Sequence, residues 1–157
     1  MPKLSAGILA CRMKGNSLEF FLVHPGGPFW ADKDSGSWSI PKGEYKEGED
    51  PLAAAKREFE EETGFEPPEN LIALKPLKQP SGKIVSAWAA EGDFDEGKLR
   101  SNTFKIEWPP RSGNEREFPE VDKAGWFAYE SARQKILKGQ VGFLDEAEVV
   151  IKQGQAK

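Results

Sequence analysis

The stretch KREFEEETGF, residues 56–65, places four glutamates in five positions. On a helix, Glu58, Glu61 and Glu62 stand at i, i+3 and i+4 and project from one face, whereas Glu60 points away from them. Like charges at this spacing destabilise a helix, and negative charge near its C-terminal end opposes the helix dipole. A divalent cation would relieve both penalties, because carboxylate oxygens are the ligands that Mg²⁺ and Mn²⁺ prefer. Taken alone, such a stretch is more often a solvated acidic face, and a metal-binding face is the alternative.

The residues upstream of this stretch distinguish the two interpretations. Gly43 is followed after five residues by Glu49, and after seven more by REFEEETGF at 57–65. This pattern resembles the Nudix box, which is a glycine, five residues, a glutamate, seven residues, and then Arg-Glu-apolar-any-Glu-Glu-any-Gly-apolar. Every specified position matches without a gap. The chain is thus similar to Nudix hydrolases, most specifically over 43–65 and more loosely along its whole length.

The resemblance implies a role for each residue of the box. Glu58, Glu61 and Glu62 would be metal ligands, together with the backbone carbonyl of Gly43. Arg57 would orient these glutamates and Glu49 would brace the preceding loop, so both are counted with the catalytic residues. Either Glu58 or Glu61 would accept the proton of the attacking water.

Some members of the family take this base from outside the box. The candidates here are Glu107, Glu115, Glu117 and Glu120, each of which could also be a solvated loop charge.

The implied reaction is Mg²⁺-dependent hydrolysis of a diphosphate bond by metal-activated water, with Mn²⁺ as an alternative cofactor. The substrate would be a nucleoside diphosphate linked to a further group, such as a nucleoside triphosphate or a dinucleoside polyphosphate. WSIPKGEYKEGED, residues 38–50, resembles the corresponding part of diadenosine polyphosphate hydrolases. The wider pattern is similar to a bacterial, MutT-like subgroup of nucleoside triphosphate pyrophosphohydrolases. A nucleotide-binding Nudix sensor without catalysis is the alternative, although such modules usually lack part of the glutamate set.

Substrate-binding candidates lie on both sides of the box glycine. Lys42 directly precedes it, where related sequences place a basic residue near the substrate. Trp30, in the Gly-rich loop GGPFWADKDSGS, has a flat face on which a nucleobase could stack. Trp38 could do the same, whereas Trp88 lies within a strand-like run and is expected in the core. His24 ends a strand-like run, and we expect a structural role for it.

The box helix has clear boundaries in the sequence. Asp50 is a favourable N-cap, Pro51 suits the first helical position, and Gly64 suits the left-handed position after the last turn. These signals predict a helix over 51–63. Its core-facing residues would be Leu52, Ala55 and Phe59 at i, i+3 and i+7.

The remaining pattern is rich in strands. Apolar or alternating runs predict strands near 5–13, 18–25, 71–79, 83–92, 103–108 and 124–129, with a short extended piece at 38–43. A long polar loop is expected over 109–122, helices over 130–137 and 143–153, and a frayed tail over 153–157. The order favours an α/β class fold, and the resemblance implies an α/β/α sandwich with a mixed β-sheet.

The totals are those of one soluble domain. The 157 residues are expected to form a single domain, 1–157, and the net charge of −4 gives no reason to expect a nucleic acid polymer or a membrane as partner. Cys11 is the single cysteine, so no intrachain disulfide can form, and we expect a buried thiol in a cytoplasmic protein. A monomer or a homodimer fits the chain equally well.

Overall fold

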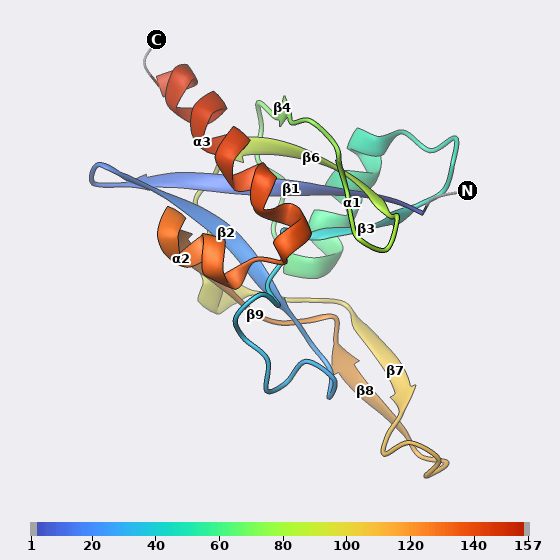
Figure 1. The fold of residues 1–157 in the computed structure, drawn as a ribbon. Helices are drawn as coiled ribbons and strands as arrows, with labels where there is room; N and C mark the ends of the chain where they lie inside the picture. Colours follow the sequence, from blue (N-terminus) through green and yellow to red (C-terminus); the bar gives the residue numbers. More distant parts are fainter. Residues whose placement is uncertain (1–2, 156–157) are drawn as a thin grey trace.

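The computed structural model describes residues 3–155, with side chains described up to residue 153. Figure 1 shows a mixed sheet with α2 and α3 on one face and α1 on the other, as an α/β/α sandwich requires. The helices are α1 (Pro51–Thr63), α2 (Tyr129–Lys135) and α3 (Val141–Gln155). The strands are β1 (Leu4–Lys14), β2 (Ser17–Pro25), β3 (Lys42–Tyr45), β4 (Ile72–Ala73), β5 (Leu77–Lys78), β6 (Ile84–Glu91), β7 (Thr103–Glu107), β8 (Glu115–Pro119) and β9 (Val121–Ala128).

The main sheet has the order β4-β6-β1-β2-β9, in which β1 and β6 are parallel. β1 and β2 pair only near their hairpin, from Cys11 opposite Phe20 to the turn. Farther from the turn the two strands separate, and the chain over 39–45 fills the gap. Ile8 donates its amide to the carbonyl of Pro41, and β3 continues along β1. This split in the sheet holds the start of the box against its centre.

The α1 helix begins and ends as the sequence predicts. The Asp50 side chain accepts the amide of Ala53 at 3.2 Å, and Pro51 is the first helical residue. Gly64 has φ +78 and donates its amide to the carbonyl of Glu60. Phe59 and Ala55 are fully buried as expected. Leu52 is only half-buried, because the buried stripe is completed instead by the neighbouring Ala54 and by Thr63.

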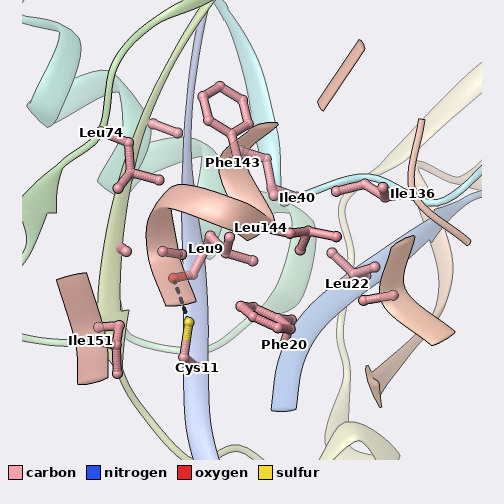
Figure 2. Close-up of a cluster of buried hydrophobic side chains, with 14 of the residues drawn as sticks. Leu9, Cys11, Phe20, Leu22, Ile40, Leu74, Ile136, Phe143, Leu144 and Ile151 are labelled. Atoms are coloured by element: carbon pink, nitrogen blue, oxygen red, sulfur yellow. Dashed lines mark hydrogen bonds between the residues drawn. The ribbon is translucent and has the colours of Figure 1, made fainter. Parts of the chain in front are cut away.

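The alternation of side chains along β1 builds a core on each face of the sheet. Ile8 and Ala10 face the α1 side, where they belong to the cluster that contains Phe59. Leu9 and Cys11 face the α2 and α3 side (Figure 2), where Phe20, Leu22, Phe143 and Leu144 surround them. The central strand is therefore buried on both faces, as a continuous apolar run predicts.

Three expectations about the secondary structure were wrong. The segment expected as a long polar loop contains β8, which pairs with β7 in a hairpin that extends away from the main sheet (Figure 1). Its strand has exposed charged side chains on both faces, so it lacks the apolar alternation of a half-buried strand. The run at 71–79 forms two short strands, β4 and β5, rather than one. Residues 153–155, expected as part of a frayed tail, belong to α3, whereas 156 and 157 lie outside the described residues.

No helix in the described part of the chain is both long enough and apolar enough to cross a membrane.

Cys11 should be unreactive in the folded protein. Burial raises the pKa of its thiol to about 12, and the charge of Glu91 adds to the effect. Since the thiolate is the nucleophile, we expect 5,5′-dithiobis(2-nitrobenzoate) at pH 8 to react at least about a thousandfold more slowly than with a free thiol. Guanidinium chloride should restore full reactivity. A Ser17→Cys variant, with a thiol at an exposed position, should react at once with one equivalent, and equal rates for both thiols would contradict the burial of Cys11.

Candidate active site

Arg57 ties the start of the box to its helix. Its guanidinium donates to Glu49 in the preceding loop and to Glu58 at 3.3 Å, and its Nε lies 3.9 Å from a carboxylate oxygen of Glu61. The Arg57 guanidinium therefore contacts three glutamates of the box. This contact offsets part of the repulsion between carboxylates on neighbouring turns of the helix.

The carboxylate of Glu58 lies directly against the backbone of Gly43. A Cβ added at Gly43 would stand 2.0 Å from Oε2 of Glu58, closer than any non-bonded contact allows. Glycine at this position leaves room for the Glu58 carboxylate where it lies. The Glu58 side chain is 13% exposed, and burial raises its pKa, with the charges of Glu61 and Glu120 adding to the effect and Arg57 opposing it.

Glu62 lies deeper and pairs with Lys42. Its Oε1 accepts the backbone amide of Lys42 at 3.2 Å. Burial raises the pKa of Glu62 to about 8, against the opposing effect of the Lys42 charge. Burial also lowers the pKa of Lys42, and the nearby Lys83 lowers it further. The site therefore holds a carboxylate and an ammonium group that are both costly to keep charged in its interior.

The carbonyls at the end of α1 bind the segment that leads into the β7–β8 hairpin. The amide of Asn102 donates to the carbonyl of Glu61 at 2.8 Å, and the amide of Glu120 donates to the carbonyl of Asn102 at 2.8 Å. Both ends of the hairpin are thus attached beside the box glutamates. Burial raises the pKa of Glu120, and the charge of Glu61 raises it further, which reports that these two carboxylates are near each other.

A pocket of about 190 Å³ opens at this point. Its lining includes Lys42, Glu62, Glu120, Trp30 and Ser39. A larger, open depression of about 900 Å³ lies beside Glu49 and Arg57 and includes Lys3 and Lys46, but not Glu62 or Glu120. The smaller pocket therefore joins the box to the external carboxylate.

The other external glutamates are placed elsewhere on the hairpin. Glu107 and Glu115 are cross-strand partners near its tip, where Glu107 accepts the amide of Arg111 at 2.7 Å. Glu117 lies opposite Lys105 in the strand register. All three are exposed, whereas Glu120 is half-buried. Of the four candidates named from the sequence, the structure brings only Glu120 to the pocket.

The tryptophans divide between the surface and the core. Trp30 is 37% exposed and lines the pocket. Trp38, considered as a surface for base stacking, is only 5% exposed, because it packs against Phe127 and donates its indole N–H to Asp34. That expectation was wrong. Trp88 is half-buried in β6 and packs against the core on the α1 side.

The carboxylates of the box are of the type that a hard divalent cation prefers. The glutamates supply carboxylate oxygens with raised pKa values, and such groups gain from a cation that stabilises their ionised form. Among residues 3–153, no three acidic, histidine or cysteine side chains already form a metal-binding group. Glu58 is engaged by Arg57 and Glu62 by the Lys42 amide, so these side chains would reorient to bind a cation.

Comparison with known proteins agrees with this arrangement. A family model described as the NUDIX domain matches residues 1–147. The chain belongs to the Nudix family. The box, the α/β/α layers and the position of α1 at the split of the sheet are therefore the features of a Nudix domain.

One curated protein resembles part of this Nudix domain. An RNA pyrophosphohydrolase of Rhizobium meliloti (strain 1021) is 32% identical over 96 residues, which are 52% of this chain and 54% of that protein. The match thus spans about half the length of this curated relative.

Among solved structures, a C. elegans Ap4A hydrolase binary complex has a TM-score of 0.66 at 22% identity, covering 95% of this chain and 98% of the other. The NUDIX domain of Shewanella oneidensis NrtR, complexed with ADP ribose, has a TM-score of 0.63 at 16% identity, covering 98% and 88%. At these identities the likeness shows the fold.

Proposed function

We propose that this Nudix domain is a pyrophosphohydrolase that uses Mg²⁺ to cleave a diphosphate bond in a nucleotide. The observation that carries the proposal is the arrangement at one pocket of Glu62 from the box, Glu120 from outside it and the half-buried Lys42. The similarity to an RNA pyrophosphohydrolase and the shared fold with an Ap4A hydrolase support the same class of reaction.

Glu58, Glu61 and Glu62, with the carbonyl of Gly43, would hold the cation. When bound, Mg²⁺ supplies charge neutralisation for the diphosphate and lowers the pKa of water. Arg57 contacts Glu58 and Glu61, and Glu49 contacts Arg57 from the loop, so Arg57 would orient both glutamates as they turn toward the cation.

The remaining groups at the pocket would handle the substrate and the proton. Lys42 offers a cation to a phosphate oxygen, and Trp30 offers an aromatic face to the base. Glu120, whose raised pKa favours accepting a proton, is our candidate for the general base, with Glu58 and Glu61 as the alternatives inside the box.

A phosphate-release screen tests this function. Purified protein with excess Mg²⁺ would be given ordinary and oxidised nucleoside triphosphates, dinucleoside polyphosphates, ADP-ribose, nucleotide sugars and 5′-triphosphorylated RNA. Each assay would run with and without inorganic pyrophosphatase to separate pyrophosphate from phosphate as products. We expect turnover of at least one compound, abolished by EDTA. Binding of a nucleotide by calorimetry without any turnover would support the sensor alternative instead.

Gly43→Ala should reduce activity without unfolding the domain. The added Cβ would overlap the carboxylate of Glu58, so the carboxylate must move by about 1 Å or more, a displacement that typically reduces turnover about a hundredfold. The measurement is kcat/KM on the best substrate of the screen, with circular dichroism to verify folding.

Gly97→Ala is the matched control for this substitution. The Cβ added at Gly97 would stand 3.2 Å from the end of the Asp95 side chain, at a position away from the pocket. This variant should keep wild-type activity. Equal activity of Gly43→Ala and wild type would show that the contact between Gly43 and Glu58 has no catalytic importance.

A further inference from the structure

His24 is the single histidine of the chain, and it lies fully buried at the end of β2. Its Nδ1 lies 2.7 Å from Oδ1 of Asp122, and its Nε2 lies 2.6 Å from the backbone carbonyl of Lys33. Both atoms opposite the ring are oxygens, and a backbone carbonyl can only accept a hydrogen bond. Nε2 must therefore carry a proton.

The second nitrogen faces the same requirement. An ionised carboxylate also only accepts, so the contact between Nδ1 and Asp122 needs a proton between these two atoms. A neutral imidazole beside an ionised Asp122 would turn one nitrogen lone pair toward an oxygen. Both contacts become hydrogen bonds when the pair of side chains holds one more proton, as in an imidazolium beside a carboxylate.

A β-bulge brings Asp122 to this position. His24 pairs with Lys123 on β9, but Pro25 pairs with Val121, so Asp122 is the extra residue between them. Bulges commonly redirect a side chain near a functional site. Without the bulge, the regular alternation of β9 would not supply a carboxylate next to the buried ring.

The Lys33 carbonyl belongs to the loop that carries Trp30. The amide of Lys33 donates to the carbonyl of Trp30 at 3.0 Å, and the Lys33 ammonium lies 5.2 Å from the centre of the Trp30 ring. Trp30 in turn lines the pocket with Glu62 and Glu120. A continuous set of contacts thus runs from Asp122 through His24 and Lys33 to the side of the pocket.

The two ends of this loop have their own attachments. At the start, the Gly26 amide donates to the carbonyl of Glu120, and a Cβ at Gly26 would stand 2.0 Å from the carbonyl oxygen of Pro119. At the far end, Asp34 accepts from the indole of Trp38, and Gly36 donates to the carbonyl of Gln134. The bond from His24 is what joins the middle of the loop to the sheet.

We propose that His24 is a positioning residue whose Nε2–H holds the Lys33 carbonyl and so fixes Trp30 against the pocket. Loss of the ring releases the loop and weakens the binding of substrate. The part that concerns substrate rests on the function proposed above, whereas the link between ring and loop does not.

The charged groups around the ring come from each element packed against it. Asp122 on β9 contacts the ring directly. Trp38 lies edge-on to it with ring centres 5.3 Å apart, and Lys123, Lys135 and Asp34 surround that indole. Of these charged groups, Asp122 contacts the imidazole, and Lys123 is the cross-strand partner of His24 on β9.

Nuclear magnetic resonance can test the link without any substrate. Because the chain has one histidine, the two imidazole ¹⁵N signals are unambiguous, and their shifts distinguish an imidazolium from each neutral tautomer. We expect the pattern of a ring that carries a proton on Nε2 wherever the amides of Trp30 and Lys33 are protected from hydrogen exchange. A ring without a proton on Nε2 beside a protected loop would overturn the proposal.

Two variants, one at Asp122 and one at His24, distinguish the role of the Asp122 carboxylate from that of the imidazole ring. The amide introduced by Asp122→Asn can donate to Nδ1, so a neutral ring with its proton on Nε2 still holds Lys33. This variant should keep the loop protected at every pH at which it is folded. His24→Gln should lower the protection of the Trp30 and Lys33 amides about tenfold or more, while the β1 and β2 amides keep theirs. Unchanged loop protection in His24→Gln would overturn the proposal.

Kinetics supply the last readout, with diadenosine tetraphosphate and Mg²⁺ as the probe. For His24→Gln we expect KM to rise several-fold and kcat to change much less, because Trp30 contacts the substrate away from the reacting bond. Glu148→Gln, in a surface pair with Lys152 on α3, is the control and should match wild type. A fall in kcat with unchanged KM would overturn the positioning role. If no protein, wild type included, turned over any substrate of the screen, the proposed hydrolase would fail, and the resonance and exchange data would still decide the role of His24.

Discussion

Glu62→Gln should reduce kcat by at least about a hundredfold while the domain stays folded. The substitution removes one of the anionic ligands proposed for Mg²⁺, and a metal ion contributes several kcal/mol to stabilising charge in such reactions, at about 1.4 kcal/mol per factor of ten. The amide oxygen can still accept the backbone amide of Lys42, and Glu44 and Glu58 remain near the Lys42 ammonium. The measurements are kcat at saturating Mg²⁺ and the thermal unfolding midpoint.

Glu60→Gln is the matched control, since it makes the same chemical change on the same helix. Glu60 is exposed and points away from the pocket. Its replacement should leave kcat within about twofold of wild type, as surface substitutions normally do. Equal losses in both variants would mean that general negative charge on α1, rather than the Glu62 carboxylate, supports activity. Wild-type turnover in Glu62→Gln would remove Glu62 from the proposed ligands.

Glu120→Gln should lower kcat by about a hundredfold or more with a smaller change in KM, because general bases typically contribute about 10²–10⁴ to the rate. The side chain is half-buried at the pocket, close enough to Glu61 for its charge to raise the Glu120 pKa. The substitution keeps the shape of the side chain and removes its ability to take a proton. The measurement is kcat and KM as functions of pH, and the loss should be similar throughout the range where wild type is active.

Glu117→Gln provides the comparison for this second prediction. Glu117 is exposed on the same hairpin, where it lies opposite Lys105 in the strand register. Its replacement should change neither kinetic constant by more than about twofold. If Glu120→Gln retained wild-type kcat while Glu58→Gln or Glu61→Gln lost it, the base would lie inside the box.

The structure also explains why a loop and a hairpin far apart in the sequence accompany the box. The hairpin is attached at both ends beside the last turn of α1, and the loop that carries Trp30 is attached to the end of β8 through Gly26. Phe29 of the loop and Trp108 of the hairpin are packed edge to face, with ring centres 5.4 Å apart. The two segments are therefore in contact with each other as well as with the site.

The sequence by itself determined the elements whose causes are local. Asp50, Pro51 and Gly64 set the ends of α1, and the 3.6-residue period places Glu58, Glu61 and Glu62 on one face with Phe59 turned inward. The spacing from Gly43 and Glu49 to this helix was enough to indicate the family. These features depend on residues within about one helix length of each other, so the chain order alone specifies them.

Only the tertiary structure decided which distant residues join the site. Glu120 could not be distinguished from Glu107, Glu115 and Glu117 until the pairing of β7 with β8 and their attachment to α1 were known. Trp38 was considered as a surface for base stacking, yet it packs against Phe127 in the core. His24 and Asp122 are 98 positions apart and meet through a bulge that no local pattern marks. Strand register and the approach of separate segments depend on the whole packed chain, so tertiary packing decides which residues line the pocket.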